Sequence, residues 1–120
     1  MNDGLRGKAL QNLRAAQTLE AAHFDAAASR FYWAAFLACM HALTARGRKP
    51  SEFESGATTW THTMVAHVLA TLFPERAHRV SYRKLKSLRE KADYQPDSVT
   101  APEIEGLADA VRALHAAARL

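Results

Sequence analysis

Residues 26–45 read AAASRFYWAAFLACMHALTA, and this stretch decides the fold. Large apolar side chains recur in it at intervals of three and four residues, which is the spacing of one face of an α-helix. The residues of this wide face are Trp33, Phe36, Leu37, Met40 and Leu43, with Phe31, Ala35 and Ala38 at its margins. A helix that is apolar over so much of its circumference is predicted to lie at the centre of the protein.

The composition predicts one helical domain that spans residues 1–120. The chain is 48% apolar and contains only 5 glycines and 4 prolines, which argues against a loop-rich all-β fold. No apolar run reaches the roughly 18 residues that a membrane-spanning helix needs, so no membrane partner is expected. The single cysteine, Cys39, cannot form a disulfide within one chain and fits a cytoplasmic location.

The flanking sequence predicts four more helices, at about residues 5–22, 59–73, 75–92 and 100–118. Asp25 is the expected N-cap of the central helix, because an aspartate in that position accepts hydrogen bonds from free backbone N–H groups. Gly47 is the expected stop of the same helix. Thr100 and Glu103 have the spacing of a capping box at the start of the last helix. Together these segments predict an all-α, up-and-down bundle of four to five helices.

Basic residues concentrate in the predicted helix at residues 75–92. Seven arginines and lysines lie between residues 76 and 91 against one acid, Glu90, and they include Arg83, Lys86 and Arg89. Such a stretch suits a partner that carries phosphate groups. It is also typical of a solvated helix face that binds nothing. Both interpretations stay open at this point.

An arginine and a tyrosine lie close together in both the central and the basic helix. Arg30 shares the predicted apolar stripe of the central helix, with Tyr32 nearby. Arg89 lies four residues before Asp93 and five before Tyr94. An arginine in an apolar stripe is costly unless it meets an anion. One interpretation is a structural ion network of Arg30, Arg89 and Asp93, covered by the two tyrosines. The other is a cleft in which both arginines grip phosphate oxygens with their planar forks.

The six histidines do not have the spacing of a metal site. Only His62 and His67 lie close together on one predicted helix, and five residues of separation place them about 140° apart around its axis. No metal and no cofactor is therefore expected, and the sequence contains no P-loop, dinucleotide fingerprint or catalytic triad. His62, at the start of its helix, is the best candidate for proton transfer near neutral pH. A cap-region or surface histidine is the alternative interpretation of the same residue.

The order of these features resembles that of small bacterial HEPN-domain proteins. The matching features cover roughly residues 5–118 and are the segment 25–36, the Gly47 loop, the pair 61–62 that opens a helix, the pair 88–89 with the triplet 92–94, and the capped last helix. The resemblance implies a bundle of four to five helices, usually a homodimer, with polar residues gathered at a cleft near the dimer interface. Many such proteins are ribonucleases of toxin–antitoxin, CRISPR or abortive-infection systems. Others pair with a minimal nucleotidyltransferase or are thought to bind nucleotides.

One motif of the family is missing from this chain. HEPN ribonucleases carry an arginine followed four to six residues later by a histidine, whereas Arg89 is followed by Asp93 and Tyr94. Arginine binds and stabilises charge, but it does not transfer protons at neutral pH. The first hypothesis is therefore a module with a degenerate ribonuclease motif that binds a nucleotide, RNA or a partner nucleotidyltransferase.

The alternative hypothesis is a metal-independent HEPN ribonuclease toxin that is active as a homodimer. In that case the arginines hold phosphate groups, and a histidine or tyrosine from elsewhere in the cleft transfers the proton. The candidate residues for proton transfer are His62 and Tyr94. The candidate residues for anion or nucleotide binding are Arg30, Tyr32, Arg83, Lys86, Arg89 and Asp93.

Overall fold

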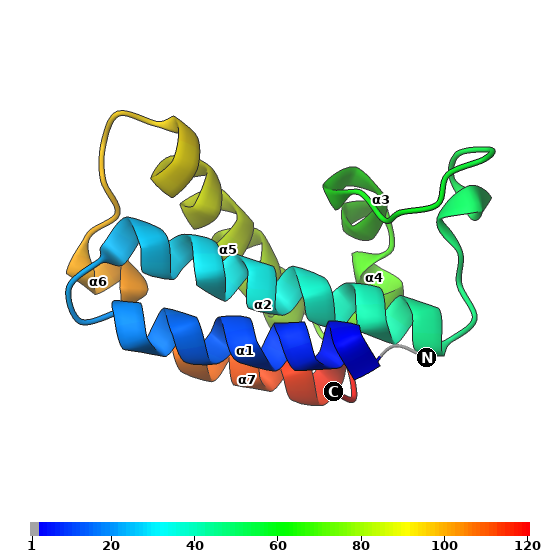
Figure 1. The fold of residues 1–120 in the computed structure, drawn as a ribbon, viewed down its shortest axis with the longest axis horizontal. Helices are drawn as coiled ribbons and strands as arrows, with labels where there is room; N and C mark the ends of the chain where they lie inside the picture. The colour runs from blue at the N-terminus through cyan, green and yellow to red at the C-terminus, as the bar shows by residue number, and fades with distance from the viewer. Residues whose placement is uncertain (1–2) are drawn as a thin grey trace.

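The first two helices lie side by side and run antiparallel (Figure 1). The computed structural model describes residues 3–120. α1 (Asp3–Leu19) is joined to α2 (Phe24–Ala45) by a short turn, and the two pack along their lengths. α1 contributes Ala9 and Ala16, which are completely buried, and Leu13, which is nearly so. Small side chains at these positions let the two helix axes approach closely.

α2 is the central helix, as the sequence predicts. It packs against α1, against α5 (Arg76–Tyr94) and against α7 (Leu107–Ala117). The predicted apolar stripe is only partly correct, because Trp33, Leu37 and Met40 are half-buried rather than buried. The most deeply buried side chains of α2 are Ala27, Ala28, Phe31, Tyr32, Ala34, Ala35, Cys39 and Leu43. α2 therefore buries most of its circumference and leaves one sector open to solvent.

α2 ends at Ala45, two residues before Gly47, which the sequence identifies as its stop. Gly47 has a φ of +76°, a left-handed conformation that glycine adopts without steric cost. Its N–H donates to the carbonyl of Thr44 at 3.0 Å, and the N–H of Arg48 donates to the carbonyl of Leu43 at 2.9 Å. This pair of bonds is a Schellman motif, which satisfies carbonyls that the end of the helix leaves free.

The predicted helix at residues 59–73 is wrong in its extent. After a loop with one turn of 3-10 helix (Pro50–Glu52), the chain forms two short helices, α3 (His62–His67) and α4 (Leu69–Leu72). The break falls at Val68, whose φ of −107° and ψ of 12° are not helical. Trp60 at the start of this segment and Phe73 at its end are both buried. Tertiary packing therefore bends the segment onto the core instead of leaving it as one straight helix.

The last predicted helix is also interrupted. Thr100 and Glu103 form the predicted capping box at the start of α6 (Ala101–Ile104). The chain then turns at Gly106, which has a φ of +80°, before α7 begins. α7 lies alongside α1, and its His115 bonds through Nε2 to the carbonyl oxygen of Ala34 in α2 at 2.9 Å. The prediction of one continuous helix from residue 100 to 118 is therefore wrong, because Gly106 redirects the chain so that α7 can cover the core.

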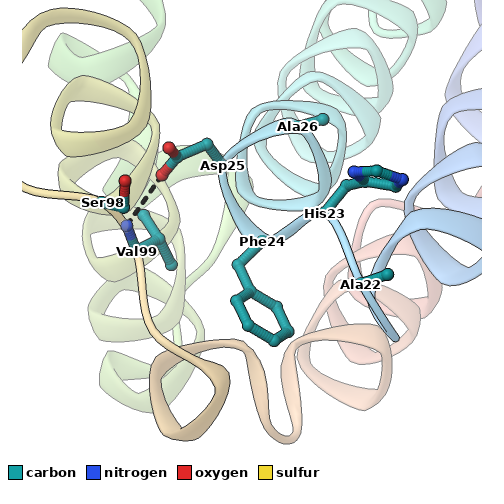
Figure 2. A pocket seen from close by; sticks show the side chains of 7 residues that line it. All are labelled: Ala22, His23, Phe24, Asp25, Ala26, Ser98 and Val99. Atoms are coloured by element: carbon teal, nitrogen blue, oxygen red, sulfur yellow. Dashed lines mark hydrogen bonds between the residues drawn. The ribbon is translucent and has the colours of Figure 1, made fainter.

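Asp25 does not cap α2, which corrects the sequence-based prediction. α2 begins two residues before the predicted start, at Phe24, and its N-cap position is His23. The carboxylate of Asp25 instead accepts a hydrogen bond of 2.7 Å from the backbone N–H of Val99, as Figure 2 shows. Both groups line a hollow of about 400 Å³ at the turn between α1 and α2. Asp25 thus ties the start of α2 to the loop that leads into α6.

The architecture is an all-helical bundle around one hydrophobic core, and residues 3–120 contain no strand. α1, α2 and α7 lie side by side, and α5 crosses α2 on another face (Figure 1). Within residues 3–120, no helix combines the length and the apolar character that crossing a membrane requires. The crossing of α5 over α2 brings the predicted site residues of these two helices together.

Candidate functional site

Arg89 lies where α5 meets α2, and its guanidinium is held from several sides. Nε donates to Asp93 Oδ2 at 2.8 Å, and Nη2 donates to Tyr94 Oη at 3.3 Å. The guanidinium carbon lies 5.7 Å from the ring centres of both Tyr32 and Trp33, and 5.4 Å from that of Tyr94. These distances fall within the range of cation–π contacts. With 16% of its side chain exposed, Arg89 presents its charge in one fixed orientation.

His62 is the first residue of α3, and its ring packs onto α2. Thr61 fixes the start of the helix, because its hydroxyl accepts a hydrogen bond of 3.2 Å from the backbone N–H of Met64. The His62 ring centre lies 4.4 Å from that of Phe36 and 5.4 Å from that of Trp33. Trp33 therefore contacts both His62 and Arg89. The tertiary structure brings an arginine and a histidine together that lie 27 residues apart in the sequence.

A chain of hydrogen bonds leads from His62 into the core. Tyr32 Oη lies 2.6 Å from His62 Nδ1 and 3.2 Å from Tyr82 Oη. Both tyrosines are buried, so each hydroxyl proton needs an acceptor. Among the residues that the structure describes, Tyr32 is the partner of the Tyr82 hydroxyl, so Tyr82 donates to Tyr32, and Tyr32 donates to His62 Nδ1. We infer from this network that neutral His62 carries its proton on Nε2.

The surroundings of His62 favour this neutral form. Burial lowers the pKa of His62 below its ordinary value of 6.5, and the positive charges of Arg89 and Lys86 lower it further. Burial raises the pKa of Tyr32 to about 12 and raises that of Tyr82 as well, so both hydroxyls keep their protons at neutral pH. His62 therefore offers a hydrogen-bond donor at Nε2. It does not offer the free lone pair that a general base needs.

A groove lies next to this cluster, between α3–α4 and α5. It encloses about 300 Å³, the lower end of the range for small-molecule sites. Tyr82, Arg83 and Lys86 line it on the α5 side, and Leu69 lines it on the α4 side. Lys86 also meets Glu90, which lies 3.8 Å away as a loose ion pair. Glu90 lines the groove as well, so the groove is a depression with two cations, one acid and an apolar wall.

Arg30 does not join the cluster, and its predicted place in the apolar stripe is wrong. The residue is exposed, and its Nη1 donates to Asn12 Oδ1 of α1 at 3.3 Å. Asp93 is bonded instead to Arg89 and, at 3.5 Å, to the hydroxyl of Ser29. The predicted network is therefore correct for the pair of Arg89 and Asp93 and wrong for Arg30. The reason is that the face of α2 that carries Arg30, Trp33 and Leu37 is the one left open to solvent, where Arg30 turns toward α1.

The two predicted tyrosines differ in their placement. Tyr94 is 72% exposed and reaches Arg89 from outside, whereas Tyr32 is completely buried and belongs to the core. Sequence reasoning missed Trp33 as the residue that links the site, and it missed Tyr82 as the end of the hydroxyl chain. A signal for Tyr82 exists in the sequence, because its spacing of seven residues from Arg89 places both on one helix face.

Within residues 3–120, no group of three or more histidine, cysteine, aspartate or glutamate side chains is arranged to hold a metal ion. No protein-family model matches the sequence, and no curated protein matches it either. What the site can do therefore follows from its own geometry.

Proposed function

We propose that this chain is a HEPN-like module that binds the phosphate of a nucleotide, free or as part of RNA, at the face formed by Arg83, Lys86, Arg89 and His62. The observation that carries the proposal is the fixed guanidinium of Arg89, stacked on Tyr32 and Trp33 beside the half-buried His62. The order of motifs along the chain supports the HEPN assignment.

The hydrogen-bonding character of this face favours an anion. Arg89 and Lys86 can only donate hydrogen bonds, and His62 presents Nε2–H. A face that presents several donors suits a ligand rich in acceptor oxygens, and a phosphate group is such a ligand. The guanidinium of Arg89 is already oriented by Asp93 and Tyr94, so binding costs little side-chain entropy.

The same geometry favours binding over RNA cleavage. A metal-independent ribonuclease needs a group that takes the proton from the attacking 2′-hydroxyl. The hydroxyl chain through Tyr32 engages Nδ1 of His62 and leaves the proton on Nε2, so neutral His62 is a donor at its free edge. The ribonuclease alternative is thus the less favoured proposal. The homodimer and the nucleotidyltransferase partner remain predictions, which light scattering and co-purification would test.

The test of the proposal is RNA binding followed by fluorescence anisotropy, with two lysine variants of the same helix. Lys86→Ala removes a cation that lines the groove, whereas Lys84→Ala removes an exposed cation about 160° away around α5. We expect Lys86→Ala to weaken binding and to reduce the slope of log K against log salt by about 0.7. Equal effects of the two variants would contradict the proposed site.

The ribonuclease alternative is tested with the same RNA in the presence of EDTA. We expect the RNA to stay intact with the wild-type protein, because His62 does not act as a base. Cleavage that resists EDTA and disappears in His62→Ala would refute the binding-only function. Cleavage that persists in His62→Ala would point to a contaminating nuclease or to another residue, and Arg89→Ala would separate these two cases.

A further inference from the structure

A second basic groove lies between α1 and α2, on the other side of Trp33 from Arg89. It encloses about 400 Å³ and is lined by Lys8, Gln11, Asn12, Ala15 and Arg30. The lining thus has two cations, two amide side chains and no acid. Arg30 is oriented within it by its bond to Asn12. This groove has the chemistry of an anion site, and the function proposed for the Arg89 face does not use it.

Trp33 connects the two basic regions across the open sector of α2. Successive residues of a helix are about 100° apart, so Arg30 lies about 60° from Trp33 in one direction and Ser29 about 40° in the other. Ala26 and Arg30 are exposed, and Ser29 and Trp33 are half-buried, so solvent reaches this sector. On the α5 side, the guanidinium carbon of Arg89 lies 5.7 Å from the centre of the Trp33 ring. A continuous surface therefore leads from Arg89 over Trp33 to Arg30.

We propose that this surface is a track for single-stranded nucleic acid. Phosphate groups lie at Arg89 and Lys86 on one side and at Arg30 and Lys8 on the other, and a base stacks on the exposed part of Trp33 between them. Proteins bind single strands by this combination of a basic groove and aromatic side chains, because every base has a flat face that stacks. The inference rests on the proposed function for its Arg89 end, but the Arg30 end is a separate site.

The track makes a prediction about ligand length. A mononucleotide bound at the Arg89 face, the site of the proposed function, reaches only that basic region, whereas a strand of several nucleotides crosses Trp33 and engages both. Substitutions at the Arg30 end should therefore weaken the binding of an oligonucleotide and leave a mononucleotide unaffected. A site that held only free nucleotides would not distinguish these two ligands in this way.

The binding test compares a hexauridine RNA, a hexathymidine DNA and uridine monophosphate by isothermal titration calorimetry. The variant is Lys8→Ala/Arg30→Ala, and the matched control is Arg14→Ala, an exposed cation of α1 outside the groove. We expect the double variant to bind both hexanucleotides about tenfold more weakly and to lose about 1.4 from the salt slope. We expect unchanged binding of the mononucleotide, and little change in the control beyond its long-range charge effect.

The outcomes separate the two proposals. If Lys86→Ala weakens hexanucleotide binding and Lys8→Ala/Arg30→Ala does not, the track is overturned and the function proposed for the Arg89 face stands. If the wild-type protein binds none of the three ligands, both proposals fail. Circular dichroism of each variant checks the fold, which we expect to be intact because Lys8 and Arg30 are exposed.

The stacking step has its own readout in the fluorescence of Trp33. In a Trp60→Phe background, Trp33 is the remaining tryptophan, and we expect its emission to be quenched when a hexanucleotide binds. Should Trp60→Phe disturb the fold, the wild-type signal minus that of Trp33→Phe supplies the same information. If the emission does not change when the oligonucleotide is added but does change with protein concentration, a second copy of the chain covers Trp33. That result would overturn the proposed track.

Discussion

The hydroxyl chain from Tyr82 through Tyr32 to His62 predicts that Tyr32→Phe and Tyr82→Phe lower the free energy of unfolding by different amounts. Tyr32 is the middle member, so Tyr32→Phe leaves the buried Tyr82 hydroxyl without its acceptor and His62 Nδ1 without its donor. Tyr82 is the end member, so Tyr82→Phe leaves the 2.6 Å contact between Tyr32 and His62 in place. We expect Tyr32→Phe to destabilise the protein more.

The magnitudes follow from the burial of each group. A buried hydroxyl left without a partner costs about 1–3 kcal/mol, and the loss of an ordinary hydrogen bond costs about 0.5–1.5 kcal/mol. Tyr32→Phe should therefore cost about 2–4 kcal/mol, because it strands Tyr82 and also breaks the bond to the half-exposed His62. Tyr82→Phe should cost about 0.5–1.5 kcal/mol. In the double variant no hydroxyl is stranded, so it should be no less stable than Tyr32→Phe alone.

The assay is urea denaturation followed by circular dichroism at a slightly alkaline pH, where His62 is neutral. A difference of 1 kcal/mol corresponds to a shift of roughly 0.3–1 M in the urea midpoint. Nitrogen NMR of the His62 ring reports the tautomer directly, and we expect the proton on Nε2. The reasoning would be refuted if Tyr82→Phe cost as much as Tyr32→Phe, if the double variant cost the sum of both, or if the proton lay on Nδ1.

Three further predictions concern pH, charge and backbone conformation. The free energy of unfolding should fall as the pH drops from about 7 to about 5. Burial lowers the pKa values of His62 and His115 below 6.5 in the folded state, so the unfolded chain binds these protons first. A urea midpoint that does not move over this pH range would contradict the prediction. Arg89→Ala should cost about 1–3 kcal/mol, less than the loss of a fully buried ion pair, because its acidic partner is exposed to solvent; thermal denaturation measures the cost. Gly106→Ala should destabilise by roughly 1–2 kcal/mol, because its φ is +80°. Gly7→Ala, the same substitution at an exposed position within α1, should stabilise the protein by roughly 0.5–1 kcal/mol. The reasoning would be contradicted if both glycine variants changed the free energy of unfolding in the same direction.

The features that could be predicted from the sequence are local ones. The helical identity of residues 26–45 follows from apolar spacing, and the stop at Gly47 follows from the conformational freedom of glycine. The capping box of Thr100 and Glu103 was predictable because its two partners are three residues apart. The pairing of Arg89 with Asp93 was predictable in the same way, because residues four apart meet on a helix.

The features that could not be predicted depend on contacts between distant segments. Asp25 looks like a helix cap in the sequence, but its carboxylate binds the backbone of Val99, which lies 74 residues further along the chain. The break at Val68 has no glycine or proline to announce it. Such choices are decided by which arrangement satisfies buried polar groups and covers the core, and local propensity is too weak to settle them.

The sequence by itself determined that this chain is helical, that residues 26–45 form its central helix, and that α5 is rich in basic residues. Only the tertiary structure decided which residues form a site. It turned Arg30 toward Asn12 of α1 and away from Arg89, and it placed His62 beside Arg89 by folding α3 onto Trp33. The physical reason is that periodicity specifies the face on which a side chain lies, whereas the packing of whole helices specifies which faces meet.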